Sequence, residues 1–145
     1  MQVLEQVLLA PYTTFGIGGP ARWFVEASTE DEVLEAVRFA QERNAPLFVL
    51  GGGSNLLVSD AGFPGVVLRI SLKGIEQKGT SESTIFSVAA GEDWDAFVTR
   101  AVGQNYAGIE CLAGIPGTVG GTPVQNVGAY GQEVAETIRL VRALD

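Results

Sequence analysis

The sequence contains no histidine and a single cysteine, Cys111. Without histidine, the chain itself provides no Ser-His-Asp or Cys-His nucleophilic site and lacks the ligand that most zinc sites use. A single cysteine excludes an internal disulfide, which indicates a reducing compartment. No apolar run reaches about 18 residues, and the first residues lack the basic region and cleavage site of a secretory signal. We therefore expect a cytoplasmic protein without a membrane span.

Basic residues are also scarce, since 9 Lys and Arg stand against 17 Asp and Glu, for a formal net charge of -8. A nucleic-acid partner would require a basic face that releases counterions, so this composition argues against one. An anionic ligand remains possible where backbone N–H groups supply the attraction. The length of 145 residues and the hydrophobic fraction of 46% are typical of one globular domain.

The spacing of apolar residues predicts an α+β fold with short, mixed strands. The segment Thr29–Glu32 has the spacing of a capping box, and the helix that follows it should end at Asn44 and Pro46. With a strand on either side, this helix makes a β-α-β unit. A second helix is predicted at 94–104, with Asp93 as its cap. The predicted strands cover residues 23–27, 47–50, 66–70 and 85–90, and residues 56–58 are apolar and strand-like.

The end of the sequence allows two interpretations. The chain closes either with a helix that starts at Gln132 or with a strand, because residues 138–144 alternate between apolar and polar types. Such a strand is either an edge strand or one whose partner lies in a longer protein. We favour the second and expect the chain to be truncated at its C-terminus.

Glycine is abundant, with 19 residues that cluster at 16–19, 51–53 and 114–131. The second cluster follows a predicted strand and continues as Ser54 and Asn55. Successive backbone N–H groups hold phosphates well, in a geometry that needs left-handed φ values and no Cβ atom. Ser54 and Asn55 add short side-chain donors. The sequence therefore predicts a phosphate-binding turn, which we call the glycine turn (residues 51–55). The alternative is a plain tight turn between strands.

Two common phosphate motifs are absent from the glycine turn. A P-loop needs a lysine followed by serine or threonine after its last glycine, and neither occurs here. A dinucleotide fingerprint needs a third glycine at the start of a helix, whereas Leu56 stands at that position. The run Gly16–Pro20 also fails, because Pro20 removes a backbone donor. Spacing alone thus leaves the ligand open.

A second glycine-rich segment runs from Ile115 to Gly131. It would let the backbone approach a flat ligand closely and offers amide groups of both polarities. Gln125 and Asn126 are unusual for a segment that only packs. The alternatives are a close-packed structural loop or one coil of a glycine-punctuated β-solenoid.

Four blocks of the sequence resemble the UDP-N-acetylenolpyruvoylglucosamine reductase family, the flavoenzymes of bacterial peptidoglycan precursor synthesis. They are Thr13–Ala21, Leu50–Leu57, Gly91–Trp94 and Gly114–Gly131, and the last is the most specific. The resemblance implies an α+β FAD-binding fold of the PCMH or vanillyl-alcohol-oxidase type with two subdomains. It places residues 1–70 in the first subdomain and residues 71–145 in an incomplete second one, with the substrate-binding domain absent from this chain.

The resemblance also implies site residues. For FAD these are Leu50, Gly51, Gly52, Gly53, Ser54, Asn55 and Leu56 in the first segment, of which residues 51–56 hold the diphosphate, and Pro116, Gly117, Gly120, Gly121, Asn126, Gly128 and Ala129 in the second. Tyr130 corresponds to a tyrosine that faces the UDP-sugar substrate, and the alternative is a surface aromatic in a loop. If the glycine turn binds phosphate, Gly53→Val should weaken FAD binding far more than it weakens the fold.

The implied reaction has NADPH deliver a hydride to FAD, which reduces the enolpyruvyl double bond of UDP-N-acetylglucosamine enolpyruvate. The family's serine acid, its glutamate and its arginine lie beyond Asp145, so no catalytic residue is assigned in this chain and no metal is expected. Two alternatives remain open. One is another FAD enzyme of the same fold, an oxidase or a hydroxy-acid dehydrogenase, and the other is a cofactor-free glycine-rich binding module.

Overall fold

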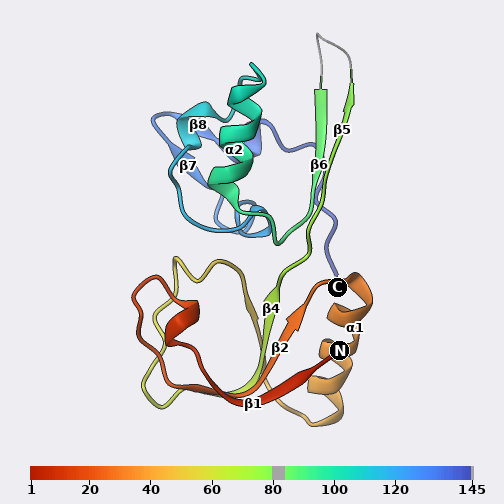
Figure 1. Cartoon of the computed structure of the whole chain (residues 1–145), viewed down its shortest axis with the longest axis vertical. Helices are drawn as coiled ribbons and strands as arrows, with labels where there is room; N and C mark the ends of the chain where they lie inside the picture. The colour runs from red at the N-terminus through yellow and green to blue at the C-terminus, as the bar shows by residue number, and fades with distance from the viewer. Residues whose placement is uncertain (80–83, 145) are drawn as a thin grey trace.

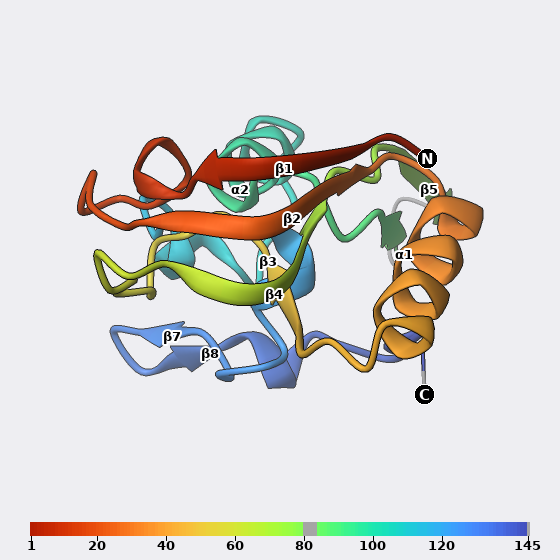
Figure 2. The same cartoon turned by 90° about the horizontal axis from the view of Figure 1, so that it is seen from below.

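The computed structural model describes residues 1–79 and 84–144. Two α+β parts lie one above the other in Figure 1. The lower part holds a four-stranded sheet and helix α1, and the upper part holds helix α2 with two small sheets. The chain passes from lower to upper between β4 and β5. Seen from below, the N-terminus lies beside α1 (Figure 2), and Arg142 near the end of the described chain pairs with Glu30 of α1 at 3.0 Å.

The sheet of the lower part has the strand order β1-β2-β4-β3. Its strands are β1 (Val3–Leu8), β2 (Pro20–Ala27), β3 (Leu47–Leu50) and β4 (Phe63–Ile70). β1 runs antiparallel to β2, whereas β2 and β3 both run parallel to β4. The predicted β-α-β unit is confirmed, with α1 (Glu30–Glu42) as its crossover. β4 follows this unit in the chain and lies between β2 and β3 in the sheet.

The start of α1 follows from its sequence. The Thr29 side chain accepts a hydrogen bond from the Glu32 N–H at 3.2 Å. The Glu32 carboxylate in turn accepts hydrogen bonds from the backbone N–H and the hydroxyl of Ser28, at 2.8 and 2.9 Å. The capping box therefore reaches back one residue beyond its usual partner. These bonds satisfy N–H groups that a helix start leaves without partners.

Both faces of this sheet are covered by apolar side chains. One face packs on α1 through the cluster of Val25, Ala27, Ala36, Ala40, Val66 and Leu68. The opposite face is covered by the cluster of Leu9, Ala21, Phe24, Leu50 and Val67, with Tyr12, Leu56 and Val58 at its margin. The loops after β1 and after β3 thus form the second layer. The residues that follow β3, including the glycine turn, are fixed against the sheet by this burial.

The upper part surrounds α2 (Trp94–Gly103), whose cap Asp93 accepts a hydrogen bond from the Ala96 N–H at 2.8 Å. Its core is the cluster of Trp94, Phe97, Val98, Leu112, Val127 and Val134. The two small sheets are hairpins, β5 (Ile75–Gly79) with β6 (Thr84–Val88) and β7 (Gly128–Ala129) with β8 (Gln132–Glu133). Short 3-10 turns cover Ala10–Tyr12, Glu110–Leu112, Val119–Gly121 and Val134–Glu136.

Three expectations about secondary structure are wrong. Residues 138–144 form no strand, because no described strand lies beside them to complete a ladder, and Leu140 stays 80% exposed. Gln132 begins no α-helix and pairs in β8 instead. Residues 56–58 form an irregular segment in which Leu56 and Val58 cover the sheet and Leu57 is exposed. The sequence also failed to indicate β1 and β5. Within the described ranges, no helix has the length and apolar character to cross a membrane.

Candidate functional site

The glycine turn leaves β3 at its carboxyl end, where the parallel strands of the lower sheet point toward the upper part (Figure 1). Among the residues that the structure describes, none accepts a hydrogen bond of standard geometry from the backbone N–H of Gly52, Gly53, Ser54, Asn55 or Leu56. Backbone N–H groups grouped in this way bind anions when a phosphate or carboxylate reaches them. Nothing in the turn carries a positive charge, so the attraction comes from amide dipoles.

The glycines of this turn are required by the protein's own backbone. Gly53 has a φ of +67°, and a Cβ atom there would overlap the carbonyl oxygen of Tyr12. A Cβ atom at Gly52 would lie 2.8 Å from the Cα of Gly117. The reason given for Gly53→Val, a side chain placed where a phosphate should lie, therefore fails, because the side chain would overlap the protein's own backbone and disturb the fold. The space beside Gly53 is filled by the loop after β1, and no phosphate would enter it from that side.

The structure brings the glycine turn against the second glycine-rich segment. The Ser54 hydroxyl donates a hydrogen bond to the Pro116 carbonyl oxygen at 3.1 Å. The Asn55 side-chain amide donates to the Oε1 of Gln125, also at 3.1 Å. These bonds join the lower part to the upper part. The two segments that the sequence marked independently therefore meet in space.

Three glycines of the second segment differ in the space around them. Gly117 adopts a φ of +137°, and its carbonyl accepts a hydrogen bond from the Trp94 N–H at 3.1 Å. Gly120 donates to the Ala90 carbonyl at 2.9 Å, and a Cβ atom there would lie 2.7 Å from the Cβ of Ala90. Gly121 has more space, since its nearest neighbour would be the Thr118 Oγ1 at 3.8 Å. Gly117 is thus favoured by its backbone conformation, whereas the small size of Gly120 serves the close packing against Ala90, in the turn between β6 and α2.

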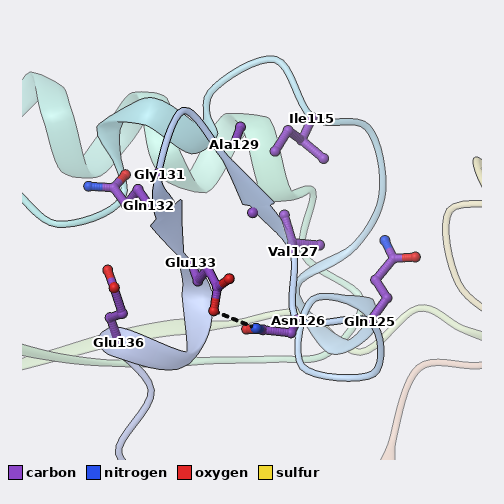
Figure 3. A pocket seen from close by; sticks show the side chains of 10 residues that line it. Ile115, Gln125, Asn126, Val127, Ala129, Gly131, Gln132, Glu133 and Glu136 are labelled. Atoms are coloured by element: carbon purple, nitrogen blue, oxygen red, sulfur yellow. Dashed lines mark hydrogen bonds between the residues drawn. The ribbon is translucent and has the colours of Figure 1, made fainter.

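A hollow of about 800 Å³ opens in the upper part (Figure 3). Its lining combines apolar and amide groups with two carboxylates, and consists of Ile115, Gln125, Asn126, Val127, Gly128, Ala129, Gly131, Gln132, Glu133 and Glu136. Asn126, Gly128 and Ala129 thus lie together, while Pro116, Gly117, Gly120, Gly121 and the glycine turn lie outside its lining. Glu133 and Glu136 make this hollow unsuitable for a diphosphate.

The Asn126 side chain makes two hydrogen bonds within the protein. Its amide nitrogen donates to the Glu133 carboxylate at 2.8 Å, as Figure 3 shows, and its oxygen accepts from the Ala135 N–H at 3.2 Å. Gln125 lies apart from that pair. These bonds use one N–H and one lone pair of the amide, which leaves its second N–H and the second lone pair of its oxygen for a ligand.

Leu50 and Leu56 occupy a different place. They line an apolar pocket of about 160 Å³ on the sheet face, together with residues of the loop after β1, including Thr13. Leu50 is also part of the buried cluster on this face, so its side chain fills the core. The predicted FAD residues of the first segment therefore differ in their surroundings. The glycine turn offers backbone N–H groups, whereas the side chains of Leu50 and Leu56 lie in apolar surroundings on the sheet face.

Tyr130 stands at the tip of the β7–β8 hairpin. It and Gly131 form the two-residue loop, with φ values of 53° and 82°, which is the pattern of a type I′ turn. The Tyr130 side chain is 94% exposed and lines neither of the two pockets. The Tyr130 side chain is exposed because the residue lies in the two-residue loop of the hairpin.

Sequence reasoning missed the loop after β1 as part of the site. The Thr14 N–H donates to the Gly53 carbonyl at 3.0 Å, and Tyr12 closes the space beside Gly53. The available signal was the block that starts at Thr13, which belongs to the resemblance although no role was assigned to it.

Residues 21–145 match the family model described as FAD binding domain. The chain belongs to this family. The predicted α+β FAD-binding fold class is thereby confirmed, since the sheets and helices described above fall within the matched residues apart from β1 and the start of β2.

Two curated relatives from different organisms carry the same name. The chain is 52% identical over its whole length to the UDP-N-acetylenolpyruvoylglucosamine reductase of Streptomyces avermitilis, of which it covers 39%. It is 42% identical, again over 100% of the chain, to the protein of that name from Pseudomonas fluorescens and covers 43% of it. The crystal structure of UDP-N-acetylenolpyruvylglucosamine reductase from Thermus caldophilus superposes with a TM-score of 0.72 at 37% identity, over 92% of this chain and 45% of that one. The resemblance found in the sequence is confirmed, and the chain spans about two fifths of these relatives' length.

Proposed function

We propose that the chain binds FAD and that the glycine turn holds its diphosphate. The observation that carries this proposal is the set of backbone N–H groups of residues 52–56, which make no hydrogen bond to the described residues. A diphosphate fits an uncharged amide cradle because each N–H supplies a partial positive charge at close range. The family match gives independent support for FAD.

The residues present fit the cofactor in further respects. The side chains of Ser54 and Asn55 donate hydrogen bonds to the second glycine-rich segment, which holds that segment against the glycine turn. We propose that Leu50 to Leu56, together with Pro116, Gly117, Gly120, Gly121, Asn126, Gly128 and Ala129, surround FAD. When bound, FAD supplies hydride transfer, and the protein supplies binding and orientation. In the same proposal, residues 1–70 and 71–145 are the two subdomains of the FAD site.

The whole-protein part of the proposal is a reductase of peptidoglycan precursor synthesis. The names of relatives at 42–52% identity support it. In this proposal NADPH is the hydride donor, UDP-N-acetylglucosamine enolpyruvate is reduced to UDP-N-acetylmuramate at its C=C bond, and Tyr130 contacts the UDP-sugar. The cytoplasm is the proposed location, since a single cysteine is in keeping with a reducing compartment. The residue that protonates the substrate is not assigned to this chain.

Titration of the chain with FAD tests the cofactor proposal. We expect saturable binding, followed by the change in flavin fluorescence, together with an increase of the unfolding temperature that grows with FAD concentration. Absence of both effects at millimolar FAD would exclude the FAD site. For the reductase, the assay is NADPH oxidation that depends on UDP-N-acetylglucosamine enolpyruvate, measured with the full-length enzyme that carries this chain. NADPH oxidation with no dependence on that compound would contradict the substrate assignment.

A further inference from the structure

The loop after β1 holds the glycine turn from behind. Besides the overlap that a Cβ atom at Gly53 would have with Tyr12, the Thr14 N–H donates to the Gly53 carbonyl oxygen at 3.0 Å. This is the hydrogen bond that fixes the direction of the Gly53 carbonyl. The loop and the turn are separated by about forty positions in the sequence, and nothing in the spacing of either one indicates the contact.

The direction of this carbonyl determines where one amide of the turn points. The peptide unit between Gly53 and Ser54 is planar and trans, so its C=O and N–H point in opposite directions. Because the Gly53 oxygen points toward Thr14, the Ser54 N–H points away from the loop. Among the described residues, none accepts a hydrogen bond from this N–H. The Thr14 contact therefore aims one free donor of the turn outward, away from the protein layer behind it.

Thr13 holds the loop in the shape that makes this contact. Its side chain is buried, with 8% of the residue exposed, and its hydroxyl lies 2.9 Å from the Ile17 carbonyl and 3.2 Å from the Ala10 carbonyl. The hydroxyl has one proton to donate, so it serves one of these two acceptors at a time. The two carbonyls lie on either side of Thr13 in the chain, and the hydroxyl closes the loop between them. No other side-chain hydrogen bond is described within Ala10–Ile17.

We propose that Thr13 is a positioning residue for the diphosphate of FAD, which acts by fixing the loop that turns the Ser54 N–H outward. The proposal rests on the FAD function proposed above. It adds that the donor is set by a residue outside the glycine turn. The Thr13 hydroxyl fixes the loop, the next residue, Thr14, donates its N–H to the Gly53 carbonyl, and that carbonyl shares its peptide unit with the Ser54 N–H. Thr13 itself touches no part of the ligand in this arrangement.

Two variants test the proposal by separating the hydroxyl from the shape of the side chain. Thr13→Val keeps the shape and removes the hydroxyl, whereas Thr13→Ser keeps the hydroxyl and removes a methyl group. We expect Thr13→Val to raise the dissociation constant for FAD about tenfold, the effect of one lost hydrogen bond to a carbonyl. Thr13→Ser should stay within about threefold of the wild type, because its hydroxyl can make the same bond.

The second readout is the Ser54 amide resonance in a proton–nitrogen NMR spectrum of the FAD titration. In the wild type and in Thr13→Ser, we expect a downfield proton shift as the amide hydrogen-bonds to a phosphate oxygen, and in Thr13→Val a smaller shift at saturating FAD. A merely structural role would lower the unfolding temperature of the FAD-free protein and leave this shift unchanged. If Thr13→Val does not fold, the proposal is still tested by the Ser54 amide shift of the wild type and by the FAD affinity of Thr13→Ser. A wild-type Ser54 amide that does not shift at saturating FAD, or a Thr13→Ser variant that binds FAD tenfold more weakly, overturns the proposal.

The two proposals fail in different ways. If the wild-type chain does not bind FAD, the proposed function fails and this inference fails with it. If the wild type binds FAD and Thr13→Val binds it equally well, the function stands and the role of Thr13 is refuted.

Discussion

The Ser54 hydroxyl donates to the carbonyl oxygen of Pro116 at 3.1 Å, across 62 positions of sequence. Ser54 lies in the glycine turn of the lower part, and Pro116 lies in the glycine-rich segment of the upper part. This one bond therefore connects the two halves of the proposed FAD site. It is a side-chain bond to backbone, so it depends on the hydroxyl of residue 54 and on no other property of that side chain.

The first prediction concerns this bond. Ser54→Ala removes the hydroxyl and leaves the backbone N–H of residue 54 in place. We expect the FAD dissociation constant to rise about three- to tenfold, because a net hydrogen bond contributes about 0.5–1.5 kcal/mol. The measurement is a fluorescence titration with FAD. Ser87→Ala on the exposed surface of β6 is the matched control and should bind FAD as the wild type does. Equal loss in both variants would contradict the assignment of this bond to the site.

The second prediction separates backbone conformation from steric overlap. Gly53 and Gly16 have the same φ of +67°, but a Cβ atom at Gly16 would meet nothing within 4 Å. Gly16→Ala should lose about 1–2 kcal/mol of unfolding free energy, the cost of a left-handed conformation alone. Gly53→Ala should lose at least about 3 kcal/mol more, at the upper end of overpacking, because its methyl group overlaps the Tyr12 carbonyl.

Urea denaturation of the FAD-free protein measures both losses. If the two variants are equally stable, the loop after β1 moves aside freely and does not hold the glycine turn. That result would also weaken the argument that the loop directs the Ser54 amide.

Local signals in the sequence predicted much of the fold. The capping box at Thr29 and the cap at Asp93 define their helices because hydrogen bonds between residues three or four apart decide where a helix starts. β3 and β4 were indicated by apolar runs. β1 and β5 were not, because most of their side chains are exposed and no apolar pattern marks them. Residues 138–144 have the pattern of a strand but no neighbouring strand, and a ladder cannot form without one.

The candidate site was only partly predictable for a related reason. Phosphate-binding geometry marked the glycine turn, and the resemblance marked the second segment. No sequence pattern indicated which part of the chain packs against each glycine. Gly53 is required by Tyr12 and Gly120 by Ala90, and both contacts join segments far apart in sequence. A glycine that accommodates a ligand and a glycine that accommodates another backbone have the same sequence signature.

The third prediction concerns pH. Hydrogen bonds from the backbone N–H and then the hydroxyl of Ser28 lower the pKa of the Glu32 carboxyl below its ordinary value. A lowered pKa means that the folded state prefers the charged form, so this stabilisation is complete above the ordinary glutamate pKa. It is lost as the pH falls through the lowered pKa of the folded state. Glu32→Gln keeps an oxygen acceptor and removes the charge.

We expect Glu32→Gln to be less stable than the wild type at pH 7, and the difference to disappear as the pH falls below the lowered pKa. Thermal unfolding over this pH range measures it. Glu42→Gln is the control, because Glu42 is the last residue of α1 and lies away from the cap at Ser28 and Thr29. A gap between wild type and Glu32→Gln that is constant over the whole range would show that the charge of Glu32 has no part in the cap.

The last prediction tests whether Tyr130 serves the hairpin or a ligand. Its φ of 53° is a conformation that asparagine adopts more readily than tyrosine, and Asn-Gly is the preferred pair for a type I′ turn. Tyr130→Asn should therefore raise the stability of the FAD-free chain by about 0.5 kcal/mol, since the 94% exposed ring contributes little packing that could be lost. If Tyr130 contacts the UDP-sugar as proposed, the same variant should raise the KM of the full-length enzyme for that substrate. Tyr130→Phe, which keeps the ring and removes the phenol, then reports whether the hydroxyl makes the contact. A Tyr130→Asn variant with higher stability and an unchanged KM would show that the tyrosine is a surface aromatic at a turn and would remove it from the substrate site.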